Sequence, residues 1–313
     1  MVKVLEAVPN FSEGRDLTKI EALVDVILSK DVEVLDWSTD PDHNRAVITY
    51  IGDPEAVEAA SVAAARFALE HIDMRNHTGV HPRVGALDVL PFVPLEGMDM
   101  GEAIASAHRV GREIGLMGLP VFFYGKASES ANRRLAELRR GGFEGLNAAL
   151  SEGLKPDTPP DTESCHPTAG VTCVGARDIL LAWNVFATGI QLQDAQEIAA
   201  DIREQGGGFS GVRALGLYLS EQARVQISMN LEDLVNTHPL DVFEVIAEKV
   251  TKKGGHIRES QVIGMIPETL VHRTMADRLL LPDLGPAQVL SHRVAEHVME
   301  RTSGLNEIAD RAE

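Results

Sequence analysis

Hydrophobic positions in the first 95 residues switch between the spacing of strands and the spacing of helices. A strand-like run covers Val4 to Pro9, and apolar residues then recur at intervals of three and four from Leu17 to Leu28, as on one face of a helix. Two β-rich runs, Val32–Trp37 and Ala46–Ile51, flank the polar segment Asp40–Asn44. Turn residues between two such runs predict a β-hairpin.

A second helix and a fourth strand complete this pattern. Asp53 and Pro54 suit the N-cap and first turn of an Ala-rich helix that continues to about Ile72. The run Val89–Pro94 reads as a strand, and its prolines suit an edge or a strand end. The first part of the chain is therefore predicted to have the order β-α-β-β-α-β.

The second half of the chain repeats this order. Its six predicted elements are residues 179–186, 192–202, 212–219, 224–231, 239–253 and 262–267. The first helices begin at residues 17 and 192 and the last strands at 89 and 262, so the copies are displaced by 175 and 173 residues. The repeat predicts an α+β protein of two ferredoxin-like subdomains, residues 1–175 and 176–313, in which a helix pair covers one face of each antiparallel sheet.

The segment between the two copies has its own pattern. A helix is predicted over residues 98–117, a strand over 119–124 and a helical stretch over 128–150, and a last helix covers 286–302. Residues 154–172 form a long loop rich in Pro, Thr, Asp and Ser. Loops of that length inside a compact protein are usually functional sites or linkers.

Charge and cysteine content narrow the class of protein. Lys and Arg number 29 and Asp and Glu number 47, for a net charge of −18. Such a chain repels phosphate backbones and anionic lipids, so neither nucleic acid nor a membrane is an expected partner. No basic and apolar leader and no apolar run of about 20 residues is seen. Together with only two cysteines, Cys165 and Cys173, this predicts a cytoplasmic protein with reduced thiols.

The densest polar cluster lies between Asp73 and Asp88 and contains His77 and His81. Two histidines four apart can bind zinc from one helix face, but Gly79 and Pro82 break helical geometry here, so no metal site is expected. An imidazole with a pKa of about 6.5 suits proton transfer near neutral pH. The alternative is that both histidines hydrogen bond to the backbone of the loop.

Three other segments offer weaker signals. The turn Asp40–Arg45 carries two carboxylates, but an Asx-Pro turn that closes a hairpin explains it without a bound cation. Gly206–Gly211 matches Gly-x-Gly-x-x-Gly, yet it follows a helix and precedes a strand, the reverse of a dinucleotide site, so we expect a flexible connector and no nucleotide cofactor. The small residues of His166–Thr172 would let a flat ligand approach the backbone, or they form a linker.

Three of these segments together resemble the glutamate formimidoyltransferase (formiminotransferase) family. They are Glu6–Arg15, His77–Asp88 and His166–Arg177, and the resemblance extends from about residue 4 to residue 300. It implies two ferredoxin-like subdomains with a folate-binding groove between them, a homodimer, and tetrahydrofolate as co-substrate without a metal. This agrees with the duplicated unit inferred from the hydrophobic pattern.

The resemblance also implies a reaction and a set of site residues. The formimino group of N-formimino-L-glutamate passes to N5 of tetrahydrofolate, a step of histidine degradation and one-carbon metabolism. His81, which alone precedes Pro-Arg, matches the catalytic histidine. Because both substrates carry carboxylates, arginines are needed in the site. The residues predicted to bind substrate or folate are Asn10, Arg45, Arg75, Arg83, His166, Pro167, Thr168, Ala169 and Gly170.

The chain departs from the animal members of the family in two respects. With 313 residues it lacks the cyclodeaminase half, so we expect a monofunctional enzyme. Where animal members have Asp-Val-Asp, it has Asp36-Trp37-Ser38 with Asp40 nearby, which leaves open which acid orients His81. Two other functions fit the same motifs: formyl transfer between 5-formyl-tetrahydrofolate and glutamate, and folate binding without catalysis.

Overall fold

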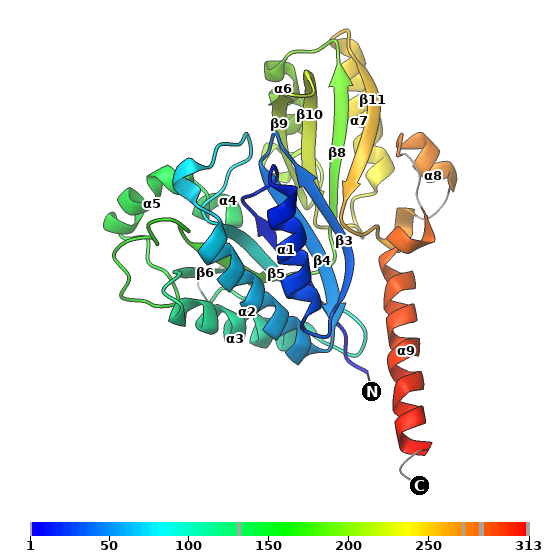
Figure 1. Ribbon diagram of the computed structural model, residues 1–313. Coiled ribbons are helices and arrows are strands. Elements are labelled where there is room, and N and C mark those ends of the chain that lie inside the picture. The colour runs from blue at the N-terminus through cyan, green and yellow to red at the C-terminus, as the bar shows by residue number, and fades with distance from the viewer. Residues whose placement is uncertain (1, 130–132, 271–272, 282–284, 311–313) are drawn as a thin grey trace. The chain divides into compact units, whose positions relative to one another are not determined.

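The computed structural model describes residues 2–129, 133–270, 273–281 and 285–310. These residues form two compact units, one running to Asp178 and resuming at Val294, the other comprising Ile179–Arg293. The first contains a seven-stranded sheet and the second a four-stranded sheet (Figure 1). The predicted α+β class with two sheets is confirmed. Among the described helices, none is both long and apolar enough to cross a membrane.

The first unit opens with the predicted element order, except that its first strand is interrupted. Its elements are β1 (Leu5–Ala7), β2 (Asn10–Phe11), α1 (Leu17–Leu28), β3 (Glu33–Asp40), β4 (Arg45–Gly52), α2 (Pro54–His71), the 3-10 turn η1 (Met74–Asn76) and β5 (Leu87–Pro94). Both β1 and β2 pair antiparallel with β4 on one side and β5 on the other. With the β3–β4 hairpin, the strand order is β3-β4-(β1, β2)-β5.

Two further strands, β6 (Val121–Gly125) and β7 (Thr172–Ala176), widen this sheet. Strand β7 lies between β5 and β6 and is parallel to both. The sequence predicts β6 but treats the segment around β7 as the end of a long loop. All five residues of β7 are buried, so it lacks the alternation that marks a half-exposed strand.

Helices cover both faces of the wider sheet. Figure 1 shows α1, α2 and α3 (Met100–Leu116) side by side across one face, where their apolar residues join those of the strands in one core. The short α4 (Leu135–Leu138) and α5 (Gly142–Ser151) contribute to a smaller core on the opposite face of β5, β7 and β6. That opposite face over β1, β2 and β4 carries the polar groups described below.

The single helical stretch predicted over residues 128–150 is wrong. Residues 130–132 lie outside the described part, and the remainder forms two helices, with a break at Gly141 and with Gly142 as the first residue of the second helix. Both glycines have positive φ, 84° and 63°, which a continuous right-handed helix excludes.

The second unit has the same element order as the first. Its elements are β8 (Leu181–Thr188), α6 (Leu192–Ile202), the 3-10 turn η2 (Glu204–Gly206), β9 (Val212–Leu219), β10 (Arg224–Leu231), α7 (Pro239–Lys252) and β11 (His256–Ile263). All pairs are antiparallel, in the order β11-β8-β10-β9. In the first unit the corresponding strands have the same order: β5, then β1 together with β2, then β4, then β3. The predicted duplication therefore extends to strand pairing.

The last strand of the second unit begins earlier than predicted. The sequence suggests residues 262–267, whereas β11 covers His256–Ile263. Its first half is polar and mostly exposed at the sheet edge, so it gives no hydrophobic signal. Met265 and Ile266, which produced the apparent strand, are buried in the segment that follows.

The C-terminal elements are η3 (Glu268–Leu270), α8 (Arg273–Arg278), η4 (Pro286–Gln288) and α9 (Leu290–Asp310). The predicted last helix is thus confirmed, with a 3-10 turn in place of its first residues. Within the first unit, His297 Nδ1 lies 3.1 Å from Glu33 Oε2, and Arg301 Nη2 lies 2.9 Å from Asp31 Oδ2. The middle of α9 therefore contacts the start of β3 and the residue Asp31 just before it.

Candidate active site

The first sheet places two predicted site residues on its face opposite α1–α3. Phe11 joins the core beneath the helices, so the neighbouring Asn10 points to the other face. Arg45, at the start of β4, donates two hydrogen bonds to Asn10 Oδ1, from Nε at 3.0 Å and from Nη2 at 2.6 Å. The two residues come from β2 and β4, which are paired neighbours.

A buried carboxylate, Asp88, holds two arginines at this place. Its Oδ2 accepts a bond of 3.1 Å from Arg45 Nη1 and a second bond from Arg139 Nη2. Its Oδ1 accepts a bond of 2.8 Å from the backbone N–H of Val84. Burial and the charge of Arg139 lower the pKa of Arg45 to about 10, which still leaves the guanidinium protonated at neutral pH.

His81 is the third predicted residue in this cluster. Its Nδ1 lies 3.1 Å from Arg45 Nη1 and 2.8 Å from the carbonyl oxygen of Pro82. Arginine can only donate and the carbonyl can only accept, so Nδ1 satisfies one of them at a time. When Nδ1–H donates to Pro82, Nε2 carries the lone pair that a general base requires.

The surroundings of His81 keep its ring neutral. Burial, followed by the positive charges of Arg45 and Arg139, lowers the pKa of His81 well below its usual value. No carboxylate of the described chain forms an ion pair with His81. Asp40 instead lies 3.4 Å from Nδ1 of His43, whose ring meets that of His81 edge to face at 5.7 Å. Two acids therefore reach His81 through one intermediate residue each: Asp88 through Arg45 and Asp40 through His43.

The competing histidine, His77, has both ring nitrogens engaged. Its Nδ1 accepts a bond of 3.0 Å from Arg83 Nε, and its Nε2 donates to the carbonyl of Asn44 at 2.7 Å. Nη1 and Nη2 of Arg83 donate to the carboxylate of Glu144 at 2.8 and 2.6 Å, and this contact lowers the pKa of Glu144 to about 2. His77 and Arg83 thus form a second polar group that ties the loop to α5.

The predicted folate loop is fixed against the segment between His81 and Asp88. Ala169 O accepts from Ala86 N at 2.9 Å, and His166 exchanges two backbone bonds with Gly170. Gly170 has a φ of +71°, and a Cβ there would lie 2.2 Å from Val84 O, so the close approach requires glycine. Pro167 and Thr168 form the tip of this turn, and Thr168 O accepts from Met74 N.

Arg75 lies apart from the cluster. Its guanidinium pairs with Asp73 two residues earlier, and its side chain is 62% exposed. Sequence reasoning missed two members of the cluster, Asp88 and Arg139. Asp88 closes the quoted His77–Asp88 motif without an assigned role, whereas Arg139 is 51 residues further along and has no local signal.

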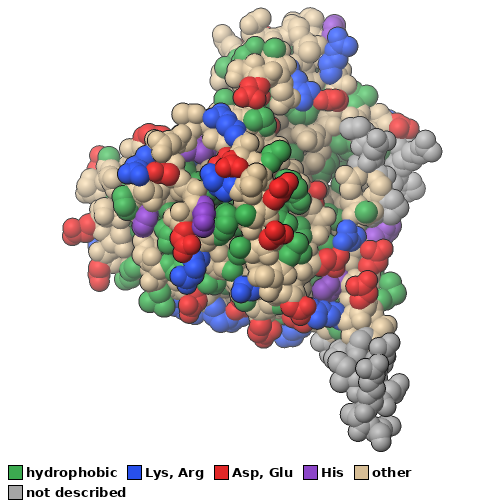
Figure 2. All heavy atoms as spheres, in the orientation of Figure 1, with side chains coloured by type: hydrophobic (Ala, Val, Ile, Leu, Met, Phe, Trp, Pro, Cys, Tyr) green, Lys and Arg blue, Asp and Glu red, His purple; other side chains and the backbone are tan. Residues whose placement is uncertain are grey.

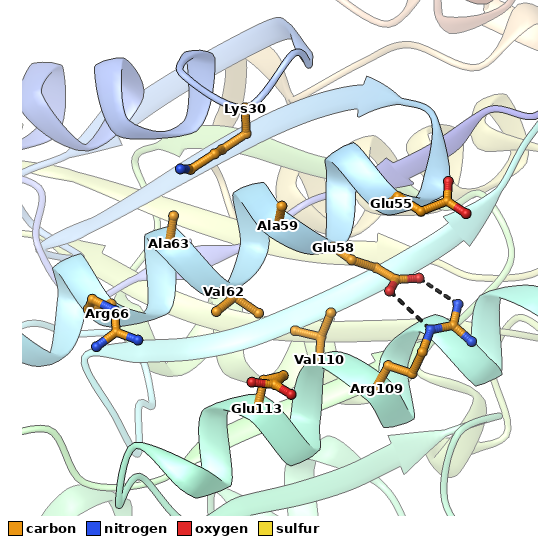
Figure 3. Close-up of a pocket in the computed structure, with 10 residues that line it drawn as sticks. All are labelled: Lys30, Glu55, Glu58, Ala59, Val62, Ala63, Arg66, Arg109, Val110 and Glu113. Carbon is orange, nitrogen blue, oxygen red and sulfur yellow. Dashed lines mark hydrogen bonds and ion pairs between the residues drawn. The ribbon is translucent and has the colours of Figure 1, made fainter.

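The outer surface of the helices offers a different kind of hollow. A depression of about 470 Å³ lies between α2 and α3. Figure 3 shows Ala59 and Ala63 of α2 among the residues that line it, and Glu58 and Arg109 paired at one side. None of the predicted site residues lines it. Acidic and basic side chains are interspersed over the face drawn in Figure 2. Among the described side chains, no group of three or more His, Cys, Asp and Glu is arranged to hold a metal ion.

Comparison with known proteins places this chain in a family. Residues 4–177 match the N-terminal subdomain of the formiminotransferase domain, and residues 182–279 match the formiminotransferase domain. Glutamate formimidoyltransferases of Streptococcus pyogenes serotype M1 and Thermoplasma acidophilum are each 38% identical to the chain. Each alignment covers 85% of this chain, and it covers 90% of the first protein and 89% of the second. The formimidoyltransferase-cyclodeaminase of Sus scrofa is also 38% identical, with 85% of this chain and 51% of that protein aligned. Since both matched segments together span most of its residues, the chain belongs to the formiminotransferase family.

Proposed function

We propose that the chain is a glutamate formimidoyltransferase. It transfers the formimino group of N-formimino-L-glutamate to N5 of tetrahydrofolate and releases glutamate and 5-formimino-tetrahydrofolate. The observation that carries this proposal is the similarity to proteins of that name over 85% of the chain. The cluster of His81, Arg45, Asp88 and Arg139 supplies groups suited to the chemistry.

His81 is proposed to move the proton that the reaction transfers. N5 attacks the formimino carbon and loses a proton, and the glutamate nitrogen gains a proton as its bond to that carbon breaks. A neutral imidazole can accept the first proton on Nε2 and deliver it to the leaving nitrogen, a contribution of typically about 10²–10⁴-fold in rate. The low pKa of His81 supports this role because the ring is unprotonated when the substrates bind.

The arginines are proposed to attract and orient the anionic substrates. Arg45 and Arg139 share one carboxylate, Asp88, so these three residues leave one positive charge uncompensated in a chain whose net charge is −18. A local positive centre of this kind favours the carboxylates of glutamate and folate. Arg83 and Arg75 are bound to Glu144 and Asp73, so substrate contact by either requires exchange of that partner.

The remaining parts of the proposal concern folate and assembly. We expect folate to lie against His166–Gly170, since this loop matches the family motif and contacts the backbone beside His81 and Asp88. Three further statements are predictions from the family resemblance. Each unit is ferredoxin-like, folate binds in a groove between the units, and the protein forms a homodimer. Repeated strand order supports the first of them.

A donor-exchange assay tests the proposal. Purified protein is incubated with tetrahydrofolate and N-formimino-L-glutamate, and separately with 5-formyl-tetrahydrofolate and glutamate, and the folate products are separated by chromatography. Formation of 5-formimino-tetrahydrofolate in the first reaction at a much higher rate is the expected result. Exclusive activity in the second reaction would identify formyl transfer. Folate binding without turnover in either reaction would identify a binding module.

A further inference from the structure

Strand β1 places a carboxyl group on the same sheet face as the candidate active site. Leu5 and Ala7 belong to the core beneath the helices, so alternation directs Glu6 to the opposite face, as it does Asn10. Strands β1 and β2 follow one another along the gap between β4 and β5. Four residues of extended chain therefore separate Glu6 from Asn10 by about 13 Å.

Glu6 is buried without a binding partner. Its residue is 4% exposed, and the residues opposite it on the two neighbouring strands, Ile51 and Val93, are fully buried and apolar. Within the described chain, its carboxyl group makes no hydrogen bond and no ion pair, and Arg177 acts on it only through its charge at longer range. Burial raises the pKa of Glu6 to about 7, and Arg177 opposes this effect.

An unpaired carboxyl in apolar surroundings points to a missing ligand. Desolvation of the ionised group lowers stability unless hydrogen-bond donors compensate it, and such groups cluster at functional sites. A carboxylate offers two parallel acceptors, which match two adjacent N–H donors on a planar ligand. It repels the carboxylates of glutamate and of the folate tail, so neither of those groups is the partner of Glu6.

We propose that Glu6 binds the pterin ring of tetrahydrofolate through the ring N3–H and the 2-amino group. This inference rests on the proposed function. The pyrimidine edge of the pterin carries these two donors side by side, and N5 lies on the far side of the fused ring. A two-ring heterocycle with a hydrogen bond at each end has about the length that separates Glu6 from the Asn10–Arg45 pair. Glu6 thereby sets the orientation in which N5 faces His81.

Substitution of Glu6 by glutamine tests the protein side of this contact. The amide keeps the size of the side chain but replaces one acceptor by a donor. We expect the Kd for tetrahydrofolate, measured by calorimetry, to rise about ten- to a hundredfold, while the KM for N-formimino-L-glutamate changes less than about threefold. Glu58→Gln, which removes an acid of α2 that pairs with Arg109 of α3, is the matched control and should leave both constants unchanged.

An analogue of tetrahydrofolate without the 2-amino group tests the ligand side. It should bind the wild-type protein more weakly, and the difference between wild type and Glu6→Gln should largely disappear with it. Equal affinity of both proteins for tetrahydrofolate would overturn the inference while leaving the proposed function intact. A rise confined to the KM for N-formimino-L-glutamate would also overturn it, because Glu6 would then face the donor. Failure of the wild-type protein to bind tetrahydrofolate would instead refute the proposed function.

Discussion

The two units share one topology but differ in the chemistry of the sheet face turned away from their helices. In the first unit, the central strands or their ends carry Glu6, Arg45 and Asp88. Arg139, the residue that follows α4, binds to Asp88 there. In the second, the middle of the equivalent face, here called the neutral face, carries Asn184, Gln226 and Ser228, because residues on either side of each belong to the helix-covered core. Arg224, at the start of β10, lies on the same side and stacks over Phe186.

The difference bears on where the proposed function resides in a duplicated fold. The strand order determines which positions point away from the helices, and this is the same in both units. In the first unit these positions carry a cluster of charged and titratable side chains, whereas the middle of β8 and β10 carries neutral amides and a hydroxyl, and Arg224 at the start of β10 pairs with Glu259. Topology therefore provides the platform, and the residues on it decide the chemistry. The predictions below compare substitutions on the two faces.

The largest effect is expected for His81 on the charged face. In His81→Gln, kcat should fall by about 10²–10⁴-fold, because the proton transfer is lost, while the Kd for tetrahydrofolate stays within a few fold. Steady-state kinetics and calorimetry on the same preparation measure both quantities. His77→Gln should reduce kcat far less, since both nitrogens of His77 are already bound to protein groups. Collapse of turnover in His77→Gln alone would reverse the two roles.

Asp88→Asn should destabilise the fold by about 3–5 kcal/mol, the usual result of removing one partner of a buried ion pair. Two buried guanidinium groups, those of Arg45 and Arg139, would lose their shared counter-ion. Urea unfolding monitored by circular dichroism gives the free energy directly. Asn184→Ala on the neutral face is the comparison and should cost clearly less. Equal losses in both variants would mean that the charges of the first unit are not coupled.

Glu6→Gln should stabilise the protein at pH 8 by up to about 3 kcal/mol. The folded-state pKa of about 7 lies above an unfolded value near 4.5, so the native state binds more protons than the unfolded state between these values. Wild-type stability therefore falls as pH rises through this window, and the neutral amide avoids the loss. Unfolding free energies of both proteins at pH 4.5 and pH 8 measure the effect. A constant difference across this range would show that Glu6 is not the titrating group.

The smallest effect is expected on the neutral face of the second unit. Gln226 is fully buried, and neither its Oε1 nor its Nε2 has a partner among the described atoms. Gln226→Leu removes two unsatisfied polar atoms at similar volume, so stability should stay equal or rise by about 1 kcal/mol. Thermal unfolding together with kcat provides the check. A large fall in folate affinity in this variant would show that the neutral face also binds substrate and would end the contrast between the units.

Much of the fold could be predicted from the sequence because its signals are local. The bounds of β9 and β10 match the predicted runs Val212–Leu219 and Arg224–Leu231 to the residue, since alternation and turn residues define a hairpin. Helices α1, α2 and α7 also follow their apolar spacing within a few residues. The motif around His81 was recognisable for the same reason: its residues are contiguous.

Contacts between distant segments were decided only by the tertiary structure. Strand β7 joins β5 and β6 in parallel, and parallel pairing of a short buried strand leaves no periodic pattern in the chain. Placement of Arg139 on Asp88 depends on that widened sheet and on α4, and Glu6 is desolvated by neighbours from β4 and β5. The sequence by itself thus determined which local elements form and which motif is present. Burial and charge pairing, which set the pKa of His81 and of Glu6, arise only when those elements are packed together.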